Sequence, residues 1–385
     1  MESTLSSERT LVRIIRCVLT NEYTAFDIPE SEWNGIVDAA KKHGLIIYVY
    51  QYLDHFGGKV KVDPDVYTAL KQNYYSAVKQ SILQENAAAQ MKDTFEAMGI
   101  DHMFFKGTVT RTRYQNELLR SMGDIDVLYD PEQEKDLQDA MKRLLFRCDS
   151  RGRVHDIYKG EQGIVVEAHR ELLPPGSPYA LFSDELCRRV HKVHGVSHCY
   201  EMNLEDEIIF NIIHLASHFK KGGAGIRFII DIWVYHRLEA NMEYIISELK
   251  SLGLEEFYNN TVKLAERWFG DETENTITML SMEEYILNAG IFGTEKNRND
   301  SVIATGRMSY LRRIMFPSFK DMRSMFPWLR HRVFLPLAWL IRGVESLAKR
   351  KKNVRILFRA FLSGDMHNAK ALAAFYESCG LTEEK

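Results

Sequence analysis

Two aspartates, Asp124 and Asp126, stand two positions apart in an otherwise apolar stretch and have the types and spacing of a reactive site. Their neighbours Ile125 and Val127 favour a β-strand. Side chains alternate between the two faces of a strand, so both carboxylates share one face, about 7 Å apart. At that spacing they can hold one hard divalent cation or bridge two. The alternative is a surface strand that enters a turn with both acids solvated.

A third carboxylate follows in Glu167-Ala168-His169. Glu167 and His169 also alternate onto one face of a predicted strand. A third acid on a neighbouring strand is what a two-metal phosphoryl or nucleotidyl transfer site requires, because its ions contact the attacking oxygen, the transferred phosphorus and the leaving group. His155 and His169 are candidate general bases, and the competing interpretation is that each orders a neighbouring strand.

The segment Lys106-Gly107-Thr108 ends a short apolar run and has the composition of a tight turn. Thr108 offers a hydroxyl to a phosphate, and Lys106 offers a point charge. The competing interpretation is that Lys106 is a solvated residue at a strand end.

Two i, i+4 pairs downstream also bear on the site. His214 and His218 share a helix face, but no third ligand is near in sequence, so we expect polar contacts facing a cleft, or a seam between regions, rather than zinc. Arg227 and Asp231 have the spacing of a structural ion pair. A contact between Arg227 and a triphosphate is the alternative hypothesis.

The elements around these residues alternate between strand and helix. Residues 100–105 predict a strand, followed by a turn and a helix through Tyr114. Strand 124–129 carries the acids, a helix covers 131–146, and strands 153–158 and 163–169 form a hairpin. The proline-rich loop 174–178 predicts a domain edge.

Helical periodicity dominates both flanks. The N-terminal pattern includes helices over about 64–74 and 78–98, and helices are expected again from Leu204 onward. The Gly-rich segment 221–225 follows a helix, so it is not a dinucleotide-binding fingerprint. The expected fold class is α+β: a small mixed β-sheet core (residues 96–200) flanked by an N-terminal helical region (1–95) and a C-terminal helical domain (201–385).

Composition is ordinary for a soluble globular protein, with 45% hydrophobic and 27% charged residues among 385. Five scattered cysteines without a C-x-x-C pair fit a reducing compartment, and no signal peptide or membrane-spanning run is predicted. We therefore expect a cytoplasmic protein. Between Arg307 and Arg359, fourteen Lys or Arg residues stand against two acids, which predicts either a solvated helical face or contact with phosphates, an acidic partner or a membrane surface.

Together these motifs resemble the nucleotidyltransferase superfamily related to DNA polymerase beta, and within it a bacterial branch. That branch carries Lys-Gly, then Arg-x-x-x-Asp-hydrophobic-Asp, then Glu-x-His. The matching residues are Lys106-Gly107, Arg120 with Asp124 and Asp126, and Glu167-Ala168-His169. Residues 33–53, His214, His218, Arg227 and Asp231 resemble its flanking helices. One departure is that the superfamily's Gly-Ser stands about ten residues before the acids, whereas here sixteen residues separate Gly107 from Asp124.

The resemblance implies a magnesium-dependent nucleotidyltransferase. Two Mg²⁺ ions would be held by Asp124, Asp126 and Glu167, and the nucleoside triphosphate, expected to be ATP, would contact Lys106, Gly107, Thr108, Arg120, Gly123 and Arg227. The acceptor is open among a small molecule, a peptide and a protein, while nucleic acid is disfavoured because no aromatic-interleaved basic groove is apparent. Transfer of another phosphoryl group, or a non-catalytic nucleotide-binding scaffold, are the alternatives.

Overall fold

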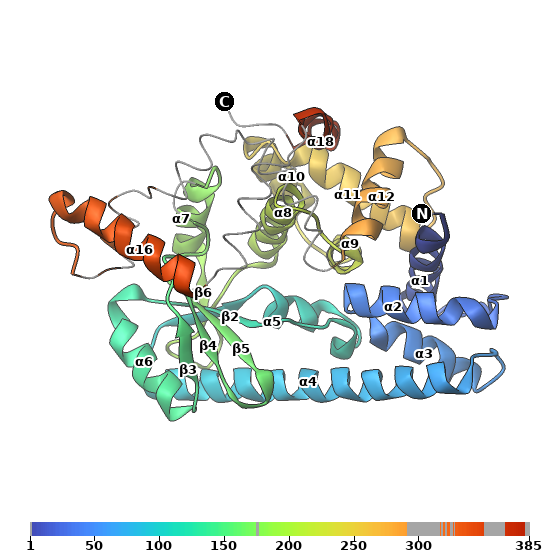
Figure 1. Cartoon of the computed structure of the whole chain (residues 1–385), viewed down its shortest axis with the longest axis horizontal. Helices are drawn as coiled ribbons and strands as arrows, with labels where there is room; N and C mark the ends of the chain where they lie inside the picture. Colours follow the sequence, from blue (N-terminus) through green and yellow to red (C-terminus); the bar gives the residue numbers. More distant parts are fainter. Residues whose placement is uncertain are drawn as a thin grey trace.

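The chain was analysed as a computed structural model, shown in Figure 1, which describes residues 2–174, 177–290, 316, 319, 322–323, 326, 328–349 and 366–381. A central sheet lies beside a large group of helices, and one long helix runs beneath both (Figure 1). Much of the basic tract 307–359 lies outside the described residues. No helix among those described is both long and apolar enough to span a membrane.

The central sheet is mixed and has the strand order β1-β2-β5-β4-β3. Its strands are β1 (His102–Phe105), β2 (Ile125–Tyr129), β3 (Arg147–Ser150), β4 (His155–Lys159) and β5 (Val165–His169). β2 runs parallel to β5, and the other pairings are antiparallel. Together with the helical flanks, this sheet confirms the predicted α+β class.

Three local predictions differ from the structure. The strand predicted at 124–129 begins at Ile125, so Asp124 lies just before β2. The helix expected through Tyr114 is a short α5 (Gly107–Thr110) followed by a 3₁₀ turn, Arg111–Arg113. Strand β3 was not predicted, because residues 147–149 are exposed and carry no apolar alternation.

Helix α4 is continuous from Pro64 to Ala97, where the sequence pattern predicted two helices. Asp63 caps its start by accepting hydrogen bonds from the backbone of Asp65 and Val66, and no glycine or further proline interrupts the 34 residues. α4 contacts α6 (Glu134–Arg143) near one end and α3 (Ile46–Phe56) toward the other (Figure 1). With α6 it covers one face of the sheet, burying Met91 and Phe95 against Ile125 and Val127.

The N-terminal and C-terminal helices share a second hydrophobic core on the opposite face of the sheet. Its helices are α1 (Glu2–Thr20), α2 (Trp33–His43), α3, α7 (Ala180–Arg189), α8 (Leu204–Lys220), α9 (Ile226–His236), α10 (Met242–Ser251), α11 (Glu255–Phe269) and α12 (Ile277–Ala289). Helix α18 (Met366–Ser378) packs beside α12. Helices that precede the sheet in the sequence therefore pack against helices that follow it. The division of the chain into three regions stays a prediction.

A buried histidine links these two helical segments. Gly44 ends α2 with a left-handed φ of 70°, which favours glycine. His43 is fully buried, and its Nδ1 lies 3.3 Å from the backbone nitrogen of Ile226 at the start of α9. A Cβ on Gly225 would meet the carbonyl oxygen of Gly290 at 2.8 Å, so only glycine permits this approach.

His43 should make stability depend on pH. Nδ1 accepts from a backbone N–H, so Nε2 carries the proton and donates to Leu287. Burial, reinforced by Lys42, lowers the pKa of His43 to about 4. The unfolded chain takes up this proton at higher pH than the folded chain, so stability falls as pH drops below the unfolded pKa. Between pH 7 and about pH 5, the loss specific to His43 is about 2 kcal/mol.

Urea unfolding at both pH values measures this loss in the wild type and in His43→Gln, which cannot titrate. The variant should lose about 2 kcal/mol less than the wild type between the two pH values. Equal losses in the two proteins would contradict a buried, neutral His43.

Candidate active site

The strand pairing brings two of the predicted acids directly opposite each other. Asp126 on β2 is the register partner of Glu167 on the parallel strand β5. Asp126 is buried, whereas Asp124 and Glu167 are half-buried. Asp124 lies two residues before Asp126, and the charges of Asp126 and Glu167 both raise its pKa. The three predicted carboxylates therefore gather at one place on the sheet.

Lys106 provides a cation to this cluster in the ligand-free chain. It follows β1, whose last residue Phe105 is the register partner of Asp126, and its Nζ donates to Asp126 Oδ1 at 2.7 Å. Its backbone has φ 53° and ψ −129°, a conformation that residues with a side chain seldom adopt. A strained conformation of this kind persists where the surrounding structure fixes it. Here it places the ammonium group of Lys106 against Asp126.

Two histidines from the hairpin complete the cluster. His169 Nε2 lies 2.9 Å from Asp126 Oδ1 and 3.3 Å from Glu167 Oε2. His155 Nε2 lies 3.5 Å from Glu167 Oε1. Within the described part of the chain, His155, Glu167 and His169 are the residues whose ligand atoms gather closely enough to hold one ion.

The charges of this cluster are strongly coupled. Burial favours neutral acids, but Lys106 and His169 outweigh burial and lower the pKa of Asp126. The pKa of Glu167 is also lowered, since the hydrogen bond from His169 outweighs burial. Burial, Asp126 and Glu167 instead raise the pKa of Asp124 to about 6. Asp124 is thus the carboxylate of the three whose burial and like charges outweigh the nearby cations Lys106 and Arg227.

The donor set fits a divalent metal ion. Oxygen ligands from Asp124, Asp126 and Glu167 suit Mg²⁺, and the charge of Asp124 is what a cation would neutralise. The imidazoles of His155 and His169 add nitrogen ligands, which transition-metal ions such as Mn²⁺ accept more readily than Mg²⁺ does.

The turn after β1 leaves one hydroxyl available. Thr108 Oγ1 is buried and has no hydrogen-bond partner among the described residues. A Cβ on Gly107 would come within 3.1 Å of Met122, so this glycine allows the turn to pack against the loop before β2. A Cβ on Gly123 would meet nothing within 4 Å, which leaves that position open.

Arg120 and Arg227 converge on one backbone carbonyl. Their Nη1 atoms lie 2.6 Å and 3.0 Å from the oxygen of Ser121. Asp231 is bound by Arg120 at 2.6 Å and by the hydroxyl of Tyr114, so its ion pair is with Arg120 rather than with the predicted Arg227. Arg227 Nε is buried and has no hydrogen-bond partner in the part of the chain that the structure describes. Burial and Arg120 lower the pKa of Arg227 to about 10.

His214 and His218 contact each other across one helical turn. Their Nε2 atoms lie 3.0 Å apart, and both rings lie near Phe228. Burial lowers the pKa of each, to about 4 for His218, and the charge of Lys106 contributes. The pair is therefore neutral and faces the cluster. Neither histidine belongs to the three-ligand group found among the described residues, and the choice of polar contacts over zinc stays a prediction.

A pocket of about 300 Å³ adjoins the turn. Lys106 and Thr108 line it, together with apolar side chains such as Phe105 and Phe210. A larger hollow of about 600 Å³ lies around Tyr129, Arg170 and α7, but none of the three acids is among its described lining residues. The three acids do not line the smaller pocket either, and its link to the cluster is Lys106, which pairs with Asp126.

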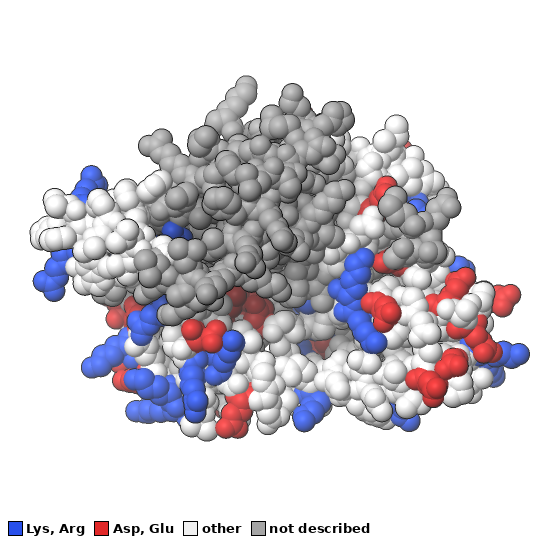
Figure 2. All heavy atoms as spheres, viewed as in Figure 1, with Lys and Arg blue, Asp and Glu red and all other residues white. Residues whose placement is uncertain are grey.

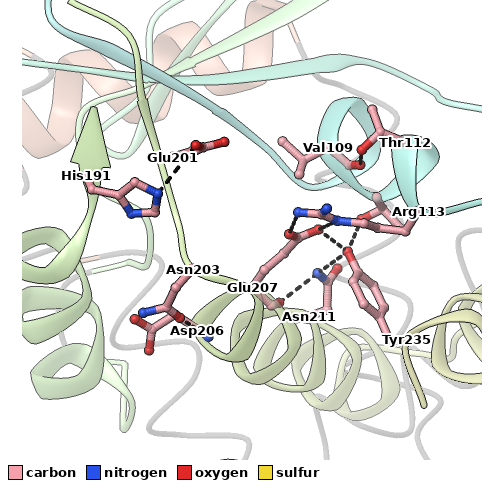
Figure 3. Close-up of polar contacts among 11 residues, drawn as sticks. Val109, Thr112, Arg113, His191, Glu201, Asn203, Asp206, Glu207, Asn211 and Tyr235 are labelled. Atoms are coloured by element: carbon pink, nitrogen blue, oxygen red, sulfur yellow. Dashed lines mark hydrogen bonds and ion pairs between the residues drawn. The ribbon is translucent and has the colours of Figure 1, made fainter. Parts of the chain in front are cut away.

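A buried network supports the floor of the smaller pocket and was missed by sequence reasoning. Figure 3 shows Glu207 and Asn211 of α8 pointing toward Arg113 of the 3₁₀ turn and Tyr235 of α9. Arg113 pairs with Glu207 at 2.6 Å, and the Tyr235 hydroxyl donates to Glu207 and accepts from Asn211 at 3.1 Å (Figure 3). The helical wheel of α8 places Glu207 and Asn211 on the face of His214, but nothing local identifies their partners.

Fold and site together define the class of protein. A mixed sheet that presents Asp126 and Glu167 in register, with Lys106 at the preceding turn, is the arrangement expected of a nucleotidyltransferase. Residues 29–270 match the model of a family described as uncharacterised nucleotidyltransferase, and the chain belongs to that family. It is therefore a transferase enzyme. Neither a search of curated proteins nor a search of solved structures returned a match.

The Arg120–Asp231 pair should be a major determinant of stability. Asp231→Asn leaves the buried Arg120 without its counter-ion, at a cost of about 3–5 kcal/mol. Urea unfolding of Asp231→Asn beside Asp38→Asn measures this cost. Asp38 is a matched control because its side chain is 77% exposed and 3.6 Å from Lys41, and its substitution should change stability by less than about 0.5 kcal/mol. Similar effects of the two substitutions would show that Asp231 is dispensable to the fold.

Proposed function

We propose that this enzyme transfers a nucleotidyl group from a nucleoside triphosphate, with ATP as the expected donor, to an acceptor and releases pyrophosphate. The observation that carries the proposal is the register of Asp126 with Glu167, which sets three carboxylates around one point beside a lysine. Absence of a membrane-spanning helix among the described residues and five free cysteines fit our assignment of the reaction to the cytoplasm.

Asp124, Asp126 and Glu167 would hold magnesium, with two ions expected. When bound, the metal would supply Lewis-acid stabilisation of the transferred phosphoryl group. Lys106 would neutralise charge on the phosphates, and Thr108 would donate its unpartnered hydroxyl to a phosphate oxygen. Gly107 and Gly123 would keep the backbone close to the nucleotide.

Arg227 would bind the triphosphate, and Arg120 would hold the shared Ser121 carbonyl and Arg227 in place. Burial and Arg120 disfavour the charge of Arg227 more than Asp231 and Asp124 favour it, and a phosphate would add a counter-ion. His169, which lies on both Asp126 and Glu167, would fix the orientation of these two carboxylates.

The pocket of about 300 Å³ beside Lys106 would take an organic part of one substrate. The class of the acceptor stays open among small molecules, peptides and proteins. Transfer of a different phosphoryl group is a second candidate, since the same three carboxylates and Lys106 would serve it.

Asp124→Asn should separate catalysis from folding. The substitution removes a metal ligand, so pyrophosphate release should fall by at least about a hundredfold. It also relieves repulsion from Asp126 and Glu167, so the melting temperature of the metal-free protein should be equal or higher. Asp126→Asn is a less clean test, because it leaves Lys106 and His169 without their common partner.

The measurement is a thermal-shift and pyrophosphate-release screen of the four nucleoside triphosphates with Mg²⁺, with Mn²⁺ and without metal. Asp149→Asn is the matched control, a carboxylate on β3 of the same sheet that pairs with Lys159. Metal-dependent stabilisation by one triphosphate, lost in Asp124→Asn and kept in Asp149→Asn, is expected. No metal-dependent shift with any triphosphate, or an unfolded Asp124→Asn protein, would refute the site.

Arg227→Ala should raise the apparent KM for the triphosphate by at least about tenfold with a smaller change in kcat, because a charged contact to substrate is lost. Its melting temperature should change little, since the substitution also removes a guanidinium that lies against Arg120. Arg227→Lys should recover part of the affinity. A loss of stability with an unchanged KM would make Arg227 a structural residue instead.

A further inference from the structure

Helix α16 (Leu335–Lys349) and the 3₁₀ turn before it (Arg332–Phe334) expose a row of large apolar side chains. The exposed fractions are 83% for Val333, 50% for Phe334, 49% for Leu337 and 67% for Leu340. Val333, Leu337 and Leu340 are spaced i, i+4, i+7, so they form one stripe along the helix. A stripe of this kind on the outside of a protein requires a partner surface.

The opposite side of α16 is already packed. Ala338 is fully buried against Met322 and Leu329, and Leu335 and Trp339 pack onto this small core. The apolar stripe is therefore not part of that small core. In Figure 1 α16 projects from the left side of the molecule.

The segment that carries the stripe has charges of one sign between Asp321 and Glu345. No acidic residue occurs from Met322 through Val344, whereas this span contains four arginines and His331. Arg330, His331 and Arg332 are exposed immediately before the stripe, and Trp328 is 45% exposed beside them. Figure 2 shows the lobe carrying α16 as mostly uncharged atoms with Lys or Arg at its rim.

We propose that α16 and its preceding turn bind the surface of an anionic lipid bilayer, with the apolar stripe in the headgroup region and the arginines on lipid phosphates. Large aliphatic side chains on one helix face, bordered by cations and an exposed tryptophan, are the features of interfacial helices. The stripe lies on a projecting helix, and a bilayer accommodates such a surface without a complementary groove. This inference is independent of the proposed chemistry, and it makes the enzyme a peripheral one.

The test is co-sedimentation of the full chain with vesicles of phosphatidylcholine alone or mixed with phosphatidylglycerol. The wild type should sediment with the mixed vesicles and be released as salt rises from about 0.1 M to about 1 M. Leu337→Asp/Leu340→Asp should weaken binding at least about tenfold, because two apolar contacts with lipid are lost. Its melting temperature should match the wild type, since both leucines are exposed.

Two further variants sharpen the test. Arg330→Gln/Arg332→Gln keeps the stripe and should lose the preference for anionic vesicles. Ile277→Asp is the matched control: Ile277 is 86% exposed, but it follows Asp271, Glu272 and Glu274 and should be without effect. The proposal is overturned if the wild type does not sediment, if Leu337→Asp/Leu340→Asp binds normally, or if the surface binds polyglutamate but not vesicles.

Discussion

The site depends on the balance of charge at Asp126. One carboxylate oxygen accepts hydrogen bonds from both Lys106 and His169, and Asp126 is buried, so an unpaired charge there would be costly. The lysine reaches it only because its backbone adopts an unfavourable conformation directly after β1. The position of this oxygen atom relative to its partners therefore depends on the turn after β1, on the register of β1 with β2 and on the pairing of β2 with β5.

Helices on the same face of the sheet as Asp126 act on that balance. α8 brings two neutral histidines toward Lys106, and α9 brings Arg227 to the loop before β2. α8 and α9 share a hydrophobic core with α1, α2 and α3. The N-terminal helices therefore help to position site residues that lie on α8 and α9. His43 is the clearest link, because it joins the end of α2 to the first turn of α9.

Sequence reasoning predicted what short-range patterns encode. Alternation placed Asp126 and Glu167 on strands, and the spacing of turns and helices gave a mixed sheet with helical flanks. It could not predict β3, whose exposed residues carry no pattern, or the continuity of α4 through a weakly periodic middle. It also paired Arg227 with Asp231 by helical spacing, whereas Arg120, distant in sequence, occupies that carboxylate. Long-range partners of buried charges leave no local signal.

Helix α4 makes the two hydrophobic cores parts of one cooperative structure. Its first turns carry Val66 and Leu70 into the core of the flanking helices, and its last turns carry Met91 and Phe95 into the core behind the sheet. Neither core can open at this helix without straining the other, because an uninterrupted helix of about 50 Å transmits displacement along its length. The sheet and the flanking helices are therefore coupled mechanically, and fluctuations that expose the site must arise in the connecting loops.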